Sequence, residues 1–194
     1  TALGGTFISY IDTILLTYFR TLNEVGIYNV ILPSSLIFLY FGGAISSAVF
    51  PMVSELWSKG DLKRLSSGLE YIYRYTFLII IPPALVIVVF SDLLIKSFFG
   101  IEYLSGAMAL QILMFGMLTF VVAGINNNII AAIGKPKVVA KIIILAAIVN
   151  VIFNLILIPS YGIEGAAIST SISYLLTLII STFALTKYIK IKFP

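Results

Sequence analysis

Residues 149–176, VNVIFNLILIPSYGIEGAAISTSISYLL, are two apolar runs separated by a short break. The first run carries Asn150 and Asn154 and stops at Pro159, a residue that cannot continue an undistorted helix. The second run opens at Gly165, and small residues recur from there at every fourth position. Small residues at this spacing let two helices approach closely in a membrane. The stretch therefore predicts a tight hairpin of two membrane-spanning helices.

The whole chain has the composition of a membrane protein. Of its 194 residues, 60% are hydrophobic and 10% are charged, whereas soluble domains carry about 25% charged residues. The sequence contains no cysteine and no histidine, which removes disulfides and the usual ligands of transition metals. We expect an integral membrane protein without a metal cofactor. The net charge of +4 is interpreted as a sign of membrane orientation rather than of nucleic-acid binding.

Six segments are long and apolar enough to cross a bilayer, which takes roughly 20 residues of helix. They are residues 1–19, 27–52, 72–95, 106–133, 138–159 and 163–186. We expect an all-α transmembrane bundle of these six helices, with residues 1–194 forming a single domain.

The basic residues support this count of spans. If the side of Lys59 is called inside, only Arg20 and Lys96 of the 12 lysines and arginines fall outside. Cytoplasmic loops are rich in lysine and arginine, and the alternation works only if all six spans exist. Both ends of the chain are therefore predicted to be cytoplasmic. The chain opens at Thr1 within a hydrophobic run, so we expect it to be part of a longer protein.

The start of the third span is open to two interpretations. Apolar residues at positions 62, 65, 69 and 72 follow helical spacing, with Asp61 placed to cap the helix. The segment is either a short amphipathic helix in the headgroup region or a cytoplasmic extension of the third span. Further along the same span, Pro82 and Pro83 predict a kink.

Asp12 is the residue within a predicted span whose placement in the bilayer costs the most free energy. It precedes Arg20 by eight residues, which places it about 12 Å inside the outer boundary at ~1.5 Å per residue. A carboxylate at that depth costs roughly 3 kcal/mol and usually faces a cavity or a partner. One interpretation is a contact with a proton, a cation or a substrate. The other is a structural pairing with a basic residue elsewhere in the protein.

Asparagines form two further polar groups within the spans. Asn126, Asn127 and Asn128 are consecutive, so they point in three directions around the fourth helix, and we regard them as cavity or transport candidates. Asn150 and Asn154 are one turn apart and share a face of the fifth helix. For this pair we favour hydrogen bonds between helices that fix their packing.

Small residues also mark the second span. Gly42 with Ser46, and Gly43 with Ser47, repeat at a spacing of four residues. We interpret both pairs as faces for tight helix packing.

Enzymes and channels are the rival classes. The acidic residues are dispersed, with no paired carboxylates for a metal-bound nucleotide sugar and no glycine-rich phosphate loop. A Ser–His pair is impossible without histidine, so we predict no catalytic residues. No ring of charge or filter-like loop indicates a channel. A pore formed by several copies of the chain stays open as an alternative.

Several motifs form an ordered set over nearly the whole chain. They are Asp12 followed by EVGIY (24–28), FPMVSEL (50–56) with KGD (59–61), FGIEY (99–103), AIGKPK (132–137) and the hairpin at 149–176. Together they resemble the polysaccharide flippases of the multidrug/oligosaccharidyl-lipid/polysaccharide transporter superfamily.

The resemblance implies two six-helix lobes around a central cavity, sometimes followed by two more helices, giving 12 to 14 in all. This chain is similar to the second lobe, with the N-terminal lobe absent. Such flippases move undecaprenyl- or dolichyl-linked oligosaccharides across the cytoplasmic membrane by alternating access. The implied partners are the lipid-linked glycan, membrane lipid and the N-terminal lobe.

The resemblance also bears on the site. Asp12 matches a position where family members place a charged or polar cavity residue. Flippases of anionic lipid pyrophosphates are expected to have a cationic cavity, yet no lysine or arginine lies clearly inside a predicted span. Any such cations are therefore expected from the N-terminal lobe.

Two alternatives to a glycan flippase stay open. A cation-coupled multidrug antiporter of the same superfamily would use Asp12 to bind a coupling ion, H⁺ or Na⁺. A flippase of peptidoglycan precursors is the other. The GKPK motif at 134–137 and the Pro159 hairpin favour the polysaccharide flippase.

Overall fold

Apolar helices build the described part of the chain. The computed structural model describes the backbone of residues 2–189 and the side chains of residues 10–189. Its elements are α1 (Ala2–Phe19), α2 (Leu22–Ser58), α3 (Leu62–Val89), α4 (Ser91–Phe98), η1 (Ile101–Gly106), α5 (Ala107–Ala132) and α6 (Pro136–Thr186). No strand occurs between residues 2 and 189. The predicted all-α fold is confirmed.

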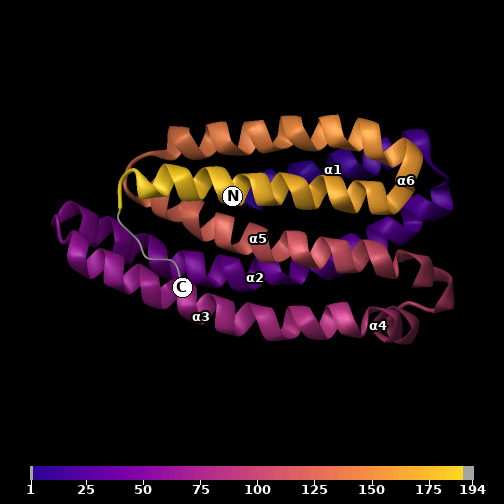
Figure 1. The fold of residues 1–194 in the computed structure, drawn as a ribbon, viewed down its shortest axis with the longest axis horizontal. Coiled ribbons are helices and arrows are strands. Elements are labelled where there is room, and N and C mark those ends of the chain that lie inside the picture. The colour runs from indigo at the N-terminus through magenta and orange to yellow at the C-terminus, as the bar shows by residue number, and fades with distance from the viewer. Residues whose placement is uncertain (1, 190–194) are drawn as a thin grey trace.

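The long helices lie side by side in an elongated bundle (Figure 1). One end, on the right of Figure 1, holds the α1–α2 turn, α4 and the turn within α6, and we call it the hairpin end. The other end holds the α2–α3 and α5–α6 turns and the end of α6. Because these turns carry Lys59, Lys135 and Lys187, we call it the lysine-rich end.

Helix α6 contains two of the predicted spans. Its 51 residues would reach about 77 Å if straight, more than twice the ~30 Å apolar thickness of a bilayer. It folds back at Gly162, whose φ of 57° and ψ of −129° are not helical. The two legs on either side of this residue correspond to the predicted spans 138–159 and 163–186. The hairpin predicted from residues 149–176 is confirmed.

Four helical segments in the described chain are long and apolar enough to cross a membrane. They are Leu22–Ser58, Leu62–Val89, Ile101–Ala132 and Pro136–Thr186. With α1 and with α6 counted as two legs, six long helical segments make up the bundle.

The third span differs from its predicted bounds of 72–95. Helix α3 begins at Leu62, and the Asp61 carboxylate caps it by accepting a 3.0 Å hydrogen bond from the Arg64 amide. The segment is therefore an extension of the third span rather than a separate interfacial helix. Pro82 and Pro83 lie within α3 without ending it. The helix ends at Val89, and the short helix α4 follows.

Helix α5 lies between α2, α3 and α6 and contacts all three (Figure 1). Its contact with α2 is close at Gly42, where an added Cβ would lie 3.2 Å from a methyl carbon of Val121. Gly43 makes no such contact within the described chain, because it is exposed and has no other atom within 4 Å of an added Cβ. The face that packs tightly is therefore narrower than the spacing of small residues indicates.

Candidate functional site

Asp12 of α1 is completely buried and accepts hydrogen bonds from three other helical segments. The Tyr28 hydroxyl of α2 donates to Asp12 Oδ2 at 2.9 Å, and the Thr170 hydroxyl of α6 donates to the same oxygen at 2.5 Å. The Asn154 amide donates to Asp12 Oδ1 at 2.6 Å, and the Asn150 amide donates to it at 3.3 Å. The carboxylate thus ties α1 to α2 and to both legs of α6.

The two asparagines are held in place by each other and by the second leg of α6. Asn154 Nδ2 donates to Asn150 Oδ1 at 3.1 Å, because residues four apart lie on one helix face. Asn150 Nδ2 also donates to Thr170 Oγ1 at 3.2 Å. Asn150 and Asn154 therefore hydrogen-bond between helices, and the helix they reach is the one that carries Asp12.

The four segments bring these residues to one depth in the bundle. Asp12 lies eight residues before Arg20, and Tyr28 lies eight residues after it. Asn154 and Thr170 stand at the same separation on either side of Gly162. At ~1.5 Å per residue, all four lie about 12 Å below the hairpin end. Because each of these residues lies eight positions from one of the two turns, residues far apart in sequence meet at the same depth.

No cation within the described chain balances Asp12. The ion pairs found between residues 10 and 189 join Arg20 to Glu24 and Lys59 to Glu55. Burying an ionised carboxylate without a positive partner is costly. The arrangement is suited to hold a proton or a small cation beside Asp12, since every hydrogen-bond donor found at the carboxylate is an uncharged group.

Oxygen atoms for such a cation are present at the site. Besides the two carboxylate oxygens, the Thr170 hydroxyl oxygen lies against Asp12. Asn154 Oδ1 is buried and has no hydrogen-bond partner in the described structure. Oxygen-only donor sets are typical of hard cations such as Na⁺ and Ca²⁺, in contrast to the sulfur and nitrogen ligands of zinc.

The hairpin end closes over this layer through Gly162. An added Cβ at Gly162 would lie 2.6 Å from Glu24 Oε2 and 2.7 Å from an Arg20 guanidinium nitrogen. Those two side chains form a 2.9 Å ion pair at the start of α2. Gly165 is more tightly constrained, because an added Cβ would lie 2.4 Å from the Leu157 carbonyl oxygen, a backbone atom of the other leg. Glycine is thus required where the hairpin turns and where its legs meet.

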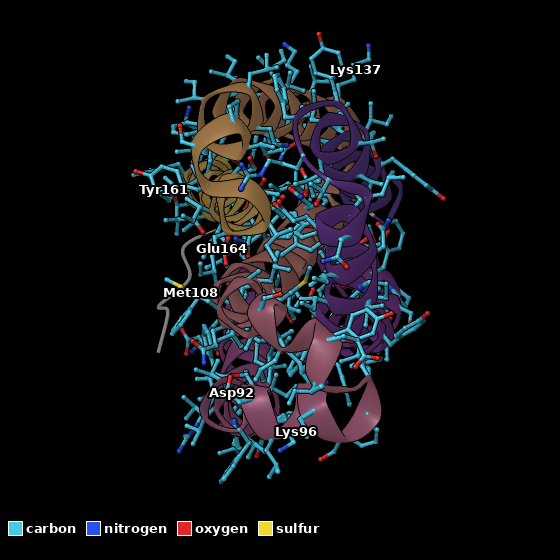
Figure 2. All side chains as sticks on the ribbon, turned by 90° about the vertical axis from the view of Figure 1, so that its right-hand side faces the viewer. Asp92, Lys96, Met108, Lys137, Tyr161 and Glu164 are labelled. Atoms are coloured by element: carbon cyan, nitrogen blue, oxygen red, sulfur yellow. The ribbon has the colours of Figure 1, made fainter. Side chains whose placement is uncertain are left out.

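The charged residues labelled in Figure 2 are exposed, except Glu164, which is half-buried. The view looks onto the hairpin end, with Tyr161 and Glu164 of α6 on one flank and Asp92 and Lys96 of α4 at the lower rim. Tyr161 is 59% exposed, whereas Asp12 is enclosed between helices.

Asn126, Asn127 and Asn128 each lie in a different environment. Asn126 joins α3 to α6: its Oδ1 accepts from the Tyr73 hydroxyl at 2.5 Å, and its amide donates to Ser181 and Thr182. Asn127 is buried, and its Oδ1 has no partner in the described structure. Asn128 donates to the Gly124 carbonyl and lines a groove between α2 and α5. None of the three hydrogen-bonds to Asp12 in the described structure.

Sequence reasoning missed Tyr28 and Thr170 as partners of Asp12. Tyrosine and threonine are common in apolar helices and carry no charge, so neither residue is recognised from the free-energy cost of placing it in a membrane. The available signal was positional, because both lie eight residues after a turn, as Asp12 and Asn154 lie eight before one.

A family model described as the lipid II flippase MurJ matches residues 6–194. The chain belongs to the MurJ family. The flippase resemblance expected from the ordered motifs is confirmed at the level of the family and its flippase-named relatives.

Two curated relatives match this MurJ-family chain over almost its full length. An uncharacterised membrane protein of Methanocaldococcus jannaschii is 40% identical over 98% of the chain and 38% of its own length. A probable low-salt glycan biosynthesis flippase of Haloferax volcanii, Agl15, is 30% identical over 99% of the chain and 41% of its own length. The chain spans about two fifths of the relatives it matches. It is a multi-pass membrane protein, and the functions these names give are transport rather than catalysis.

The fold of this MurJ-family chain is shared with a solved transporter structure. The crystal structure of MATE in the straight conformation matches 97% of the chain and 44% of that protein, with a TM-score of 0.84 and 17% sequence identity. At this identity the likeness concerns the fold alone. It identifies the bundle as one helical lobe of the kind found in that transporter.

Proposed function

We propose that this chain forms one lobe of a transporter that flips polyprenyl-linked oligosaccharides across the cytoplasmic membrane by alternating access. The family description and the glycan-biosynthesis name of the Haloferax volcanii relative support this substrate class. In the proposal, an N-terminal lobe of the same protein completes the cavity. The lysine-rich end and both ends of the chain lie on the cytoplasmic side, in keeping with the positive-inside rule.

We propose that Asp12 and its surrounding polar groups bind the coupling cation, H⁺ or Na⁺. The observation that carries this is the complete burial of Asp12 among four uncharged donors, with no cationic partner in the described chain. A proton removes the negative charge, and a sodium ion balances it. Either event lowers the cost of keeping the carboxylate between the helices.

The asparagine amides give the site a way to respond to the ion. An asparagine side chain can turn either its nitrogen or its oxygen toward a neighbour. With Nδ2 toward Asp12, as found here, Asn150 and Asn154 stabilise the carboxylate. With Oδ1 turned inward, the same two residues would join Asp12 and Thr170 as ligands of a metal cation.

The same bonds couple the ion to helix movement. Asp12 is the residue of α1 that hydrogen-bonds to both legs of α6 in the described structure. A change in its charge therefore alters how firmly α1 is held against α6. We propose that loss of the ion loosens α1, and that this helix transmits the change to the cavity between the lobes.

The experiment is glycan export in a strain that lacks its own transporter, complemented by the full-length protein. Asp12→Asn keeps the shape of the side chain and removes its negative charge. We expect it to abolish or strongly reduce export while the protein still reaches the membrane. Asp92→Asn, at the rim of the hairpin end, is the matched control and should export normally. Unchanged export by Asp12→Asn would remove this residue from the mechanism.

A cation-coupled multidrug antiporter is the second candidate. Two observations favour it: the fold shared with the MATE structure and the buried carboxylate itself, which suits ion coupling with any substrate. Efflux of a cationic dye from cells expressing the full-length protein separates the two. Dye efflux that depends on Asp12, without glycan export, would replace the flippase by the antiporter.

A further inference from the structure

A groove runs along the bundle between α2 and α5, away from the Asp12 layer. Its volume is about 390 Å³, within the roughly 300–1,000 Å³ of small-molecule sites. None of the ten residues that line it carries a charge. Among the lining residues are Gly43, Ser46, Phe50, Phe120, Gly124 and Asn128.

Ser46 is the first sign that the groove holds a ligand. The residue is 8% exposed, no hydrogen bond of its hydroxyl is found within the described chain, and the hydroxyl oxygen is not among the fully buried atoms that lack a partner. The other buried serines and threonines all bond to the protein: Ser35, Thr76, Ser91, Ser169, Thr170, Ser173, Thr177 and Ser181. A helical serine normally satisfies itself on a preceding carbonyl. The Ser46 hydroxyl instead faces the groove without a partner.

The surface of the groove is also unlike the lipid-facing surfaces of the bundle. Helix α3 presents large apolar side chains outward, among them Leu78, Leu85 and Val89. Around the groove, α2 exposes the small residues Gly43, Ala44, Ser47 and Ala48 together with the aromatic Phe50. Gly43 and Gly124 have no other atom within 4 Å of an added Cβ, so both leave space open.

The lining combines hydroxyls, an amide and aromatic rings without charge. Ser46 and Asn128 bring polar side chains to the lining, and Phe50 and Phe120 bring aromatic ones, with one face of the Phe120 ring stacked on Tyr174. Sugar rings present hydroxyl groups at their edges and apolar C–H groups on their faces, which matches this mixture. A phosphate is disfavoured, because no lysine or arginine lines the groove.

We propose that the α2–α5 groove binds neutral sugar rings of the lipid-linked glycan, an inference that rests on the proposed flippase function. The sugar hydroxyls hydrogen-bond to the Ser46 hydroxyl, and the faces of the sugar rings pack against the Phe120 side chain. The pyrophosphate and the polyprenyl chain of the same substrate lie outside the groove.

The test measures binding of two lipids by the full-length protein in nanodiscs. The probes are the methyl ester and the glucosyl ester of the same polyprenyl phosphate, so that both are phosphodiesters with one negative charge and only one carries a sugar. The wild type is expected to bind the glucosylated lipid more tightly. Ser46→Ala should reduce this preference about 2- to 10-fold, as expected for one net hydrogen bond. Gly43→Leu should abolish it by filling the groove.

Gly26→Leu is the matched control. Gly26 lies on α2, is exposed, and also has no other atom within 4 Å of an added Cβ, but it does not line the groove. This variant should keep the full preference for the glucosylated lipid. Ser34→Ala serves the same purpose for Ser46→Ala, since the Ser34 hydroxyl bonds to the Val30 carbonyl outside the groove.

The outcomes separate this inference from the proposed function. If Gly43→Leu keeps the preference for the glucosylated lipid, the proposed sugar site in the groove is wrong and the proposed flippase function is unaffected. Equal wild-type affinity for the two lipids would do the same. A wild type that binds neither lipid would overturn both. A melting temperature lowered by Gly43→Leu and not by Gly26→Leu would show that another helix fills the groove, which also contradicts the inference.

Discussion

Asp12 and Asn154 are 142 residues apart in sequence, yet the Asn154 amide donates a 2.6 Å hydrogen bond to Asp12 Oδ1. Both residues are completely buried. The bond links the first helix of the lobe to its terminal hairpin. It is one of the buried hydrogen bonds that hold α1 against α6.

Removal of this amide should destabilise the lobe. Asn154→Ala leaves Asp12 Oδ1 with a weaker set of donors in a buried position, which costs about 1–3 kcal/mol. We predict a lower melting temperature for the full-length protein in detergent. Asn29→Ala is the control, since Asn29 is exposed and accepts a 2.9 Å bond from Thr13 at the surface. Equal melting temperatures for the two variants would show that the buried bond contributes little.

The hairpin turn should be sensitive to a side chain at Gly162. Gly162→Ala combines an unfavourable positive φ of 57° with a Cβ placed 2.6 Å from Glu24 Oε2. Gly134→Ala is the comparison for a positive φ without a close contact, because its φ is 81° and its added Cβ meets no other atom within 4 Å. The backbone effect alone is about 1–2 kcal/mol. Thermal unfolding should therefore show a larger loss for Gly162→Ala, and an equal loss would mean that the ion pair moves aside freely.

The second polar cluster should stabilise the lysine-rich half. Tyr73→Phe keeps the ring and removes the hydroxyl that donates to Asn126 Oδ1. We predict a loss of about 1–3 kcal/mol, because a buried amide oxygen loses a donor. Tyr71→Phe, at a tyrosine that is 62% exposed, should unfold like the wild type. If chemical unfolding cannot distinguish Tyr73→Phe from Tyr71→Phe, the Asn126 bond is not stabilising.

Much of the fold was predictable because its signals are local. Pro159, Gly162 and Gly165 mark the hairpin directly, and long apolar runs mark the spans. The start of α3 at Leu62 was ambiguous, because an amphipathic period fits both an interfacial helix and a helix that continues into the membrane. The end of α3 at Val89 carries no proline or glycine, so nothing in the local sequence indicates it.

The site was predictable only in part, because it depends on contacts between distant segments. Asp12 was conspicuous as a carboxylate within an apolar helix. Asn150 and Asn154 were conspicuous as a polar pair, but their periodicity does not reveal which helix they reach. Tyr28 and Thr170 gave no compositional signal. Their role follows from the equal distances to Arg20 and Gly162, which become meaningful once the turns are placed side by side.

The most direct test of the account is whether a cation stabilises the full-length protein through Asp12. The measurement is the melting temperature of the wild type and of Asp12→Asn, in NaCl against choline chloride at constant ionic strength and over a range of pH. Binding to the folded state alone adds about 2.7 kcal/mol at a hundredfold excess over Kd. Na⁺ or protons should raise the melting temperature of the wild type more than that of Asp12→Asn, which keeps only the pH dependence of the other titratable groups. A wild type that responds to neither cation, or an Asp12→Asn variant that responds equally, would contradict it.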